Sequence, residues 1–352
     1  MPVGRATLQE IFNQPQVWRN CLNHLAADDV SKLVKKPRSH QWIFIGCGTS
    51  YYLAQAAAAS FTELTGCFAR AVPASEHLFY PNLVIPQAAE QVFPVLISRS
   101  GHTSEVLRVA EDLRQRGIEF LAVTCDGNEL AQLTERTVAL PVVEESTVMT
   151  SSFTSMLMAL QYIAAVLAER SDLIRALHDL PVEVEDLLGV YAPQIEDFAR
   201  DSFEGAAFLG QGPFYSIAAE SSLKVMESSS TYAQCFHTLE FRHGPKSIVT
   251  EDVLVTALLS EAGYAEESAV LTEMKDLGAR TLAIANCITP AVRSSADLAI
   301  ELALPVPELA RLVVYLVWGQ LLGAYAGLRK GLNPDAPRNL TRVVTLAGER
   351  EE

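Results

Sequence analysis

The chain contains two related halves, and this internal duplication constrains its fold more than any other feature. Residues 43–50 (IFIGCGTS) form an apolar strand pattern followed by Gly-x-Gly and small residues, and residues 207–215 (AFLGQGPFY) repeat that pattern 164 positions later. Three more pairs of segments match at offsets of 161 to 164, beginning at Val95 and Ala257, Leu121 and Leu282, and Ala139 and Ala303. A nearly constant offset through four landmarks indicates duplicated domains.

The two copies differ in one segment that is rich in hydroxyl groups. Ser98, Ser100, His102 and Thr103 of the first copy correspond to Ser260, Ala262, Tyr264 and Ala265 of the second. Most of the hydroxyls therefore survive in the first copy alone. A purely structural role would tolerate the same loss in both copies, whereas a ligand site has to be kept in one. We expect the ligand site in the first half.

Size and composition indicate a soluble globular protein. With 352 residues, 20% charged and 49% apolar, the chain is long enough for two domains of about 150 residues each. The net charge of -15, without clusters of Lys and Arg, argues against a nucleic-acid partner. The six cysteines have neither Cys-x-x-Cys nor metal-ligand spacing, so we expect reduced thiols, no metal and a cytoplasmic location.

No segment has the composition of a signal peptide or of a membrane anchor. Residues 1–6 are followed by a polar stretch, and the longest uncharged apolar run, residues 312–328, has 17 residues and contains Gln320. That length is short for a membrane span and normal for a buried helix. We expect no membrane partner.

Apolar strand patterns alternate with helical patterns along both halves. The expected strands are residues 42–45, 92–97, 120–123, 207–209, 253–258 and 281–285, and the expected helices include 104–116, 155–169 and 219–230. Continuous apolar strands alternating with helices are typical of a parallel sheet covered on both faces. The fold class is therefore α/β, with two tandem doubly wound, flavodoxin-like domains, joined by a direct helix-to-strand connection within residues 190–205. We place the first domain at 1–195, the second at 196–335 and a C-terminal tail at 336–352.

Residues 98–103 (SRSGHT), between a strand and an amphipathic helix, have the chemistry of a phosphate site. Gly101 permits a tight turn, the serines and Thr103 supply hydroxyls, and the helix N-terminus adds unpaired N–H groups with roughly half a positive charge. That combination suits an anion at the carboxyl end of a strand. The alternative is a helix that is merely capped by Ser or Thr.

Gly46-x-Gly48 by itself is a weak signal. A dinucleotide site would have a third glycine where Tyr51 stands, and no acidic strand end follows about 20 residues later, so NAD is disfavoured and no cofactor is expected. Thr49 and Ser50 then supply further hydroxyls beside a sugar or phosphate. The competing role for these glycines is close packing of a strand against a helix.

Glu220, Lys224 and Glu227 are spaced to share one face of a helix. They form either an exposed ladder of ion pairs or a partly buried cluster. Small and apolar neighbours on the same helix favour burial, and a buried carboxylate can serve as a general base. His243, in a loop that continues Gly-Pro, is either a polar loop residue or an acid/base group, and the sequence leaves this open.

With these motifs the chain resembles the sugar isomerase (SIS) family. GCGTS, SxSGxT and the spacing from Lys224-x-x-Glu227 to His243-Gly244-Pro245 resemble the isomerase half of glucosamine-6-phosphate synthases. Residues 148–154 (VMTSSFT) and 241–247 (FRHGPKS) are closer to the branch of ketose/aldose isomerases and amino-sugar-phosphate deaminases. The resemblance covers nearly the whole chain, from EIFNQP at residues 10–15 to PRNL at 337–340.

The resemblance implies a role for each matching position. Glu227 would be the base that moves a proton between C1 and C2, Lys224 would assist it, and His243 would promote ring opening, reaching a neighbouring subunit's site in a homodimer. A sugar phosphate would be bound by Cys47, Gly48, Thr49, Ser50, Ser98, Arg99, Ser100, Thr103, Ser151 and Arg342. Arg99 replaces a glutamine of the synthases, so we expect its backbone rather than its side chain to bind.

Two departures from the family narrow the expected reaction. No glutamine-hydrolysing domain precedes residues 1–15, so we do not expect glutamine-dependent synthesis. Arg342 stands where the family has a lysine that forms an imine with the open-chain sugar, and an arginine cannot supply that amine. We expect an isomerase and deaminase acting on a hexosamine 6-phosphate. The alternatives are a deglycase of a sugar–amino acid phosphate conjugate and a non-catalytic sugar-phosphate sensor.

Overall fold

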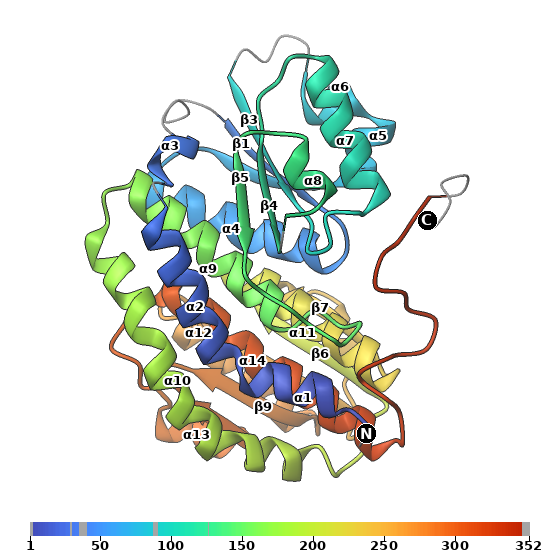
Figure 1. The fold of residues 1–352 in the computed structure, drawn as a ribbon. Helices are drawn as coiled ribbons and strands as arrows, with labels where there is room; N and C mark the ends of the chain where they lie inside the picture. The colour runs from blue at the N-terminus through green and yellow to red at the C-terminus, as the bar shows by residue number, and fades with distance from the viewer. Residues whose placement is uncertain (1–2, 29, 35–40, 87–90, 126, 347–352) are drawn as a thin grey trace. The chain divides into compact units, whose positions relative to one another are not determined.

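The computed structural model describes residues 3–28, 30–34, 41–86, 91–125 and 127–346 (Figure 1). The chain forms two compact units, and each is described by itself. The Ser98 unit comprises residues 16–144, 151–178 and 341–352, and the Glu227 unit comprises residues 1–15, 145–150 and 179–340. Residues 347–352 of the expected C-terminal tail lie outside the described residues, and the domain boundaries that we drew stay predictions.

The Ser98 unit is built on a parallel sheet of five strands in the order β2-β1-β3-β4-β5. The strands are β1 (Gln41–Gly46), β2 (Ala69–Pro73), β3 (Val92–Ile97), β4 (Leu121–Cys125) and β5 (Thr137–Leu140). Its helices include α3 (Ser31–Val34), α4 (Thr49–Thr65), α5 (Ala74–Phe79), α6 (Pro81–Val84), α7 (Ser104–Gln115), α8 (Glu129–Gln132) and α9 (Ser151–Leu167). This is the order of a doubly wound, flavodoxin-like sheet.

Both faces of this sheet are buried, as the apolar run of β1 requires. Successive side chains of a strand point to opposite faces. Ile43 and Ile45 belong to a core with Val109 and Leu113 of α7. On the other face, the ring of Trp42 lies 4.3 Å from that of Phe61 of α4 and 4.8 Å from that of Phe93. Such aromatic pairs contribute about 0.5–1.5 kcal/mol beyond their burial.

The Glu227 unit contains a second five-stranded parallel sheet, ordered β10-β9-β8-β6-β7. The strands are β6 (Gly205–Gly210), β7 (Tyr232–His237), β8 (Val253–Leu258), β9 (Arg280–Ala285) and β10 (Leu298–Glu301). Its helices include α1 (Arg5–Phe12), α11 (Pro213–Ser229), α12 (Tyr264–Asp276), α13 (Pro290–Ser295), α14 (Glu308–Arg329) and the short turns η1 (Glu240–Arg242) and η2 (Pro245–Ile248). Read from β7, the strand order is that of the first sheet, which confirms the duplicated fold.

Two long helices each contain a point in the sequence at which the chain passes from one unit to the other. Helix α2 (Gln14–Ala27) follows α1, and α10 (Ser171–Phe198) leads through a short loop into β6 at Gly205. The direct helix-to-strand connection within residues 190–205 is therefore confirmed. One landmark of the duplication was wrong in detail: Ala139 and Leu140 lie in β5, whereas Ala303 and Leu304 follow β10 instead of lying in it.

The six strands read from the sequence are all present, but the four outer strands β2, β5, β7 and β10 were missed. An edge strand is covered on fewer sides, so it lacks a continuous apolar run. In β2, four of five side chains are only half-buried. Two expected helices begin earlier than the sequence indicated, α9 at Ser151, where serines form the first turn, and α11 at Pro213, where a proline is the first residue.

Helix α14 contains the long apolar run. Its 22 residues include an 18-residue window with a mean hydropathy of 1.4, long and apolar enough to cross a membrane, yet 89% of that window is buried inside the fold. Tyr315 of this helix donates a hydrogen bond of 3.1 Å to the carbonyl of Leu259, at the end of β8. The helix is therefore part of the core, as expected for residues 312–328.

Candidate active site

The two hydroxyl-rich loops of the Ser98 unit follow neighbouring strands. Residues 47–50 follow β1, residues 98–103 follow β3, and β1 pairs in parallel with β3. Because chain connections leave β1 and β3 toward opposite faces in the order 2-1-3-4-5, this pair is the topological switch point of the sheet. Ligands of doubly wound sheets bind outside the carboxyl ends of the strands at that point.

The Ser98 loop is a tight turn whose hydroxyls are not used as a helix cap. Ser98 Oγ accepts a hydrogen bond of 3.1 Å from Gly101 N–H and lies 3.2 Å from Thr103 Oγ1, and His102 N–H donates to Ser100 Oγ over 3.2 Å. Thr103 is the N-cap residue of α7 but makes no side-chain capping bond. The alternative of a helix that is merely capped by Ser or Thr is therefore wrong, and the Thr103 hydroxyl lies beside Ser98.

Gly101 cannot be replaced without rebuilding the turn. Its φ is +64°, and a Cβ atom there would lie 1.9 Å from Oδ1 of Asn128. Asn128 caps α8 and donates to the carbonyl of Cys125 over 3.1 Å. The close approach of this amide to the loop backbone holds the Ser98 loop against the end of β4.

The GCGTS loop combines packing with hydroxyl groups. A Cβ on Gly46 would lie 2.6 Å from the carbonyl oxygen of Ser50, and the equivalent Gly210 approaches Phe214 as closely. The structural role that we considered for the first glycine therefore holds in both copies. Thr49 and Ser50 open α4 and are nearly buried, and burial raises the pKa of the Cys47 thiol to about 12. Cys47 is a neutral thiol at physiological pH.

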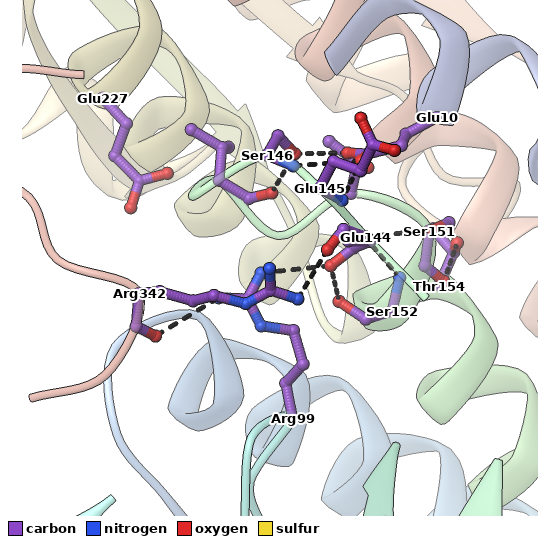
Figure 2. Close-up of polar contacts among 12 residues, drawn as sticks. Glu10, Arg99, Glu144, Glu145, Ser146, Ser151, Ser152, Thr154, Glu227 and Arg342 are labelled. Carbon is purple, nitrogen blue, oxygen red and sulfur yellow. Dashed lines mark hydrogen bonds and ion pairs between the residues drawn. The ribbon is translucent and has the colours of Figure 1, made fainter. Parts of the chain in front are cut away.

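Glu144 is the centre of a buried polar cluster at the start of α9 (Figure 2). Its carboxylate accepts hydrogen bonds from Ser151 Oγ at 3.0 Å and from Ser152 N–H and Oγ at 2.9 and 2.6 Å. Arg99 Nη1 lies 3.1 Å from the same carboxylate. The hydroxyl proton of Ser151 is therefore directed at Glu144, and Ser151 as a sugar-phosphate ligand stays a prediction.

The C-terminal segment reaches this cluster within the same unit. Arg342 donates through Nη2 to the carbonyl of Glu144, and Arg99 Nη2 donates to the carbonyl of Arg342 over 3.3 Å. Arg342 is exposed in the chain. The structure thus brings together Arg99, Ser151 and Arg342, which lie far apart in the sequence.

The predicted catalytic carboxylate belongs to a buried cluster on α11 in the Glu227 unit. Lys224 Nζ lies 3.1 Å from Glu220 and 2.5 Å from Glu227, and the side chains of Glu220, Lys224 and Glu227 are 0%, 1% and 17% exposed. The exposed ion-pair ladder is therefore excluded. Burial disfavours the Lys224 ammonium, but the two carboxylates outweigh it and raise the pKa of Lys224. Of the three, only Glu227 is open enough to contact a ligand.

A stripe of glycines on α14 determines where α11 lies. Cβ atoms on Gly319, Gly323 and Gly327 would lie 2.4, 2.6 and 2.1 Å from atoms of Ser221, Lys224 and Ser228. The two helices therefore pack with backbones in close contact, and Gly323 faces the carbonyl of Lys224. We did not recognise this role from the sequence, although the four-residue spacing of the glycines was a readable signal.

His243 lies at the end of η1, in a loop that the chain leaves exposed. Gly244 follows with a φ of +123° and Pro245 begins η2. Within the described residues this histidine has no place in either buried cluster. Its role as an acid/base group stays a prediction.

In the second copy, the equivalent loop is hydrogen-bonded to a carboxylate of the chain itself. Glu267 accepts hydrogen bonds from Ser260 N–H and Ser260 Oγ at 2.6 and 2.9 Å. Burial raises the pKa of Glu267. A carboxylate of the chain itself therefore takes the donors that a bound anion would need.

Other cavities of the described residues lie away from the predicted residues. Cavities of about 590 and 600 Å³ are lined by the starts of β9 and β10 in one unit and of β4 and β5 in the other, at the amino ends of the strands. Neither contains a residue predicted to bind sugar phosphate, as expected if ligands bind at the opposite edge. Among the described residues no group of three His, Cys, Asp or Glu could hold a metal ion.

Glu144 and Ser152 were missed in the sequence. A carboxylate seven residues before a helix carries no local pattern, and its importance depends on an arginine 45 positions away in the sequence. The other predicted residues are divided between the two units. Ser98, Arg99, Ser100, Thr103 and Arg342 belong to the Ser98 unit, and Lys224, Glu227 and His243 belong to the Glu227 unit.

Comparison with known proteins agrees with this division. A family model for the SIS domain matches residues 38–166 and 205–318. The chain is 27% identical to glutamine--fructose-6-phosphate aminotransferase [isomerizing] of Haemophilus influenzae and 28% identical to that of Gloeobacter violaceus, in each case over 96% of this chain. It spans 58% of the length of these curated relatives.

Solved structures share the fold across nearly the whole chain. Glucosamine-6-phosphate deaminase of Thermotoga maritima is 28% identical with a TM-score of 0.80, covering 97% of this chain and 100% of that one. Tagatose-6-phosphate ketose/aldose isomerase of Escherichia coli is 23% identical with a TM-score of 0.84, covering 95% of each chain, and this likeness shows the fold alone. The two matched regions fall on two equivalent sheets, so the chain belongs to the SIS domain family and contains two SIS domains.

Proposed function

We propose that the chain is a phosphosugar isomerase that deaminates a hexosamine 6-phosphate. The observation that carries the proposal is the Glu220–Lys224–Glu227 cluster, in which a buried ammonium holds one carboxylate that is still 17% exposed. A carboxylate fixed in this way is suited to remove a proton and return it. The hydroxyl-rich loops at the switch point of the other unit supply donors for a phosphate.

In the proposed reaction Glu227 removes the proton from C2 of the open-chain amino sugar. The electron pair forms a C1–C2 double bond, and the aldehyde oxygen at C1 takes up a proton to give an enolamine. Glu227 then returns its proton to C1, which leaves an iminium at C2. Water adds to this carbon, and ammonia leaves as the ketose phosphate forms. Lys224 is 1% exposed and acts by holding Glu227 in place, not by touching the sugar.

Relatives support the choice of substrate class. The deaminase of Thermotoga maritima, 28% identical, is named for glucosamine 6-phosphate, and the curated relatives are named for fructose 6-phosphate.

We also propose a homodimer, in which the exposed His243 would open the sugar ring in the partner's site. Full activity of a chain that sediments as a monomer would contradict the dimer.

The test is to incubate the full chain with glucosamine 6-phosphate and with galactosamine 6-phosphate and to measure ammonia and ketose phosphate. We expect both products, and we expect Glu227→Gln to lower turnover by roughly 10²–10⁴-fold, as for loss of a general base. Binding of the sugar phosphate, measured by calorimetry, should change little. Glu266→Gln, an exposed carboxylate on α12, is the matched control and should behave like the wild type.

Other outcomes would decide against the proposal. No ammonia from either amino sugar, with cleavage of a sugar–amino acid phosphate conjugate, would identify a deglycase. Tight binding of the sugar phosphates without turnover, unchanged in Glu227→Gln, would identify a sensor.

A further inference from the structure

Arg99 belongs to the proposed phosphate loop, residues 98–103, but its side chain is turned into the protein. Its position between Ser98 and Ser100 would allow a cation to reach a bound phosphate, yet the side chain is only 9% exposed. Its carbonyl accepts hydrogen bonds from Cys125 N–H at 3.2 Å and Thr124 Oγ1 at 3.3 Å, which holds the loop to the end of β4. The backbone at this position is therefore fixed independently of the guanidinium.

The guanidinium neutralises the buried charge of Glu144. That carboxylate is 3% exposed, and besides Arg99 it accepts three hydrogen bonds from Ser151 and Ser152. An ionised carboxylate in the interior requires a counter-charge as well as hydrogen bonds. Arg99 supplies this counter-charge, with Nη1 3.1 Å from the carboxylate of Glu144.

The same guanidinium also holds the C-terminal segment. Its second nitrogen, Nη2, donates to the carbonyl of Arg342 over 3.3 Å. Two residues further, the carbonyl of Val344 accepts a bond of 3.5 Å from Ser104 N–H, and Leu346 N–H donates to Ser104 Oγ over 3.2 Å. Residues 342–346 therefore lie along the first turn of α7, the helix that directly follows the phosphate loop. Figure 2 shows the contacts among Arg99, Glu144 and Arg342.

We propose that Arg99 is a positioning residue that ties three parts of the site together: the phosphate loop, the serines at the start of α9 and the C-terminal segment 342–346. The guanidinium donates from two separate nitrogens of one rigid fork, Nη1 to Glu144 and Nη2 to the carbonyl of Arg342. A lysine has a single nitrogen on a flexible stem, so we expect it to keep the charge pair with Glu144 and to hold Arg342 less firmly. The purpose of this arrangement, binding of a sugar phosphate, rests on the proposed function.

The test compares Arg99→Gln and Arg99→Lys with the wild type in the full chain without ligand. Limited trypsin digestion reports exposure of the bond after Arg342, and thermal unfolding reports stability. We expect Arg99→Gln to lower the melting temperature and to speed cleavage after Arg342 about tenfold, the order expected for losing a bond to a charged group. We expect Arg99→Lys to restore the melting temperature but not the slow cleavage.

The matched control is Arg114→Gln, an exposed arginine on α7, which should change neither readout. If trypsin cleaves Arg99→Lys after Arg342 as slowly as it cleaves the wild type, the proposal is overturned, because the C-terminal segment is then held without the guanidinium fork of Arg99. If Arg99→Gln does not fold, Arg99→Lys alone decides.

A kinetic measurement separates this inference from the proposed function. With glucosamine 6-phosphate as substrate, we expect Arg99→Lys to raise KM more than it lowers kcat, because the phosphate loop and its neighbours are loosened while Glu227 is untouched. A fall in kcat with KM unchanged would contradict the positioning role. If the wild type has no turnover, the proposed function fails while the digestion result still stands.

Discussion

At the residue scale, Lys224 is the side chain on which the carboxylate cluster depends. It is 1% exposed and pairs with both Glu220 and Glu227. Because its pKa is raised in the folded chain, its stabilising effect is complete below the unfolded pKa of about 10.5 and is lost only as the pH rises through the still higher folded pKa. Near neutral pH Lys224 is therefore an ammonium that pairs with both side chains.

Lys224→Met should destabilise the fold by about 3–5 kcal/mol at pH 7, because it leaves two carboxylates without their cation. Glu220→Gln should cost less, since Lys224 keeps Glu227. Urea unfolding at pH 7 measures both. Repeated above pH 10.5, the difference between wild type and Lys224→Met should shrink. A constant difference through that range would show that the ammonium is not the stabilising form.

At the element scale, the packing of α11 against α14 places the carboxylate cluster. Helix α11 begins at the carboxyl edge of its own sheet, and Glu227 lies 14 residues further, about 20 Å along the helix axis. Glu227 is therefore not a residue of its own sheet's switch point. What holds it is the contact of α11 with the glycines of α14, where no Cβ atom fits at Gly323.

Gly323→Ala should push α11 away from α14 and destabilise the chain by about 1–3 kcal/mol, the usual cost of overpacking. Thermal and urea unfolding measure this effect, and turnover should fall as Lys224 and Glu227 move. Gly189→Ala on α10 is the matched control, because nothing lies within 4 Å of a Cβ there. That change should stabilise by about 0.4–1 kcal/mol. Equal effects of both changes would refute the close-packing argument.

At the scale of the whole molecule, the two copies contain equivalent loops whose hydroxyls have different hydrogen-bond partners. In the first copy the hydroxyls of Ser98 and Thr103 lie together at the switch point. In the second copy Ser260 is bound by Glu267. Both copies have the same strand order. The donors of the loop stay open to a ligand only where no carboxylate of the chain takes them.

This difference can be tested with one substitution in each copy. Ser100→Ala should weaken binding of glucosamine 6-phosphate about tenfold and leave the melting temperature unchanged, because Ser100 is only half-buried. Ser260→Ala should lower the melting temperature, since it removes a buried partner of Glu267, and leave the affinity unchanged. Calorimetry and thermal unfolding measure the two effects. Weaker sugar-phosphate binding in Ser260→Ala would show that the second loop is also a ligand site.

Much of this protein could be read from local patterns. The inner strands were found because strands buried on both faces are continuously apolar, and Glu220, Lys224 and Glu227 were found because three- and four-residue spacings place them on one helix face. The edge strands were not found, since half-exposed residues lack that signal. A helix merely capped by Ser or Thr stayed an open alternative, because capping geometry depends on side-chain direction, which spacing does not specify.

The sequence by itself determined the duplication, the class of the sheets and which copy keeps its hydroxyls, because these depend on residue type and on neighbours a few positions away. Only the tertiary structure decided what Arg99 binds, why Glu144 matters and how α14 holds the carboxylate helix. Each of these depends on groups far apart in the chain, Arg99 on residues 45 and 243 positions away. Such contacts arise from burial, where charges must find partners and backbones approach only where no Cβ intervenes.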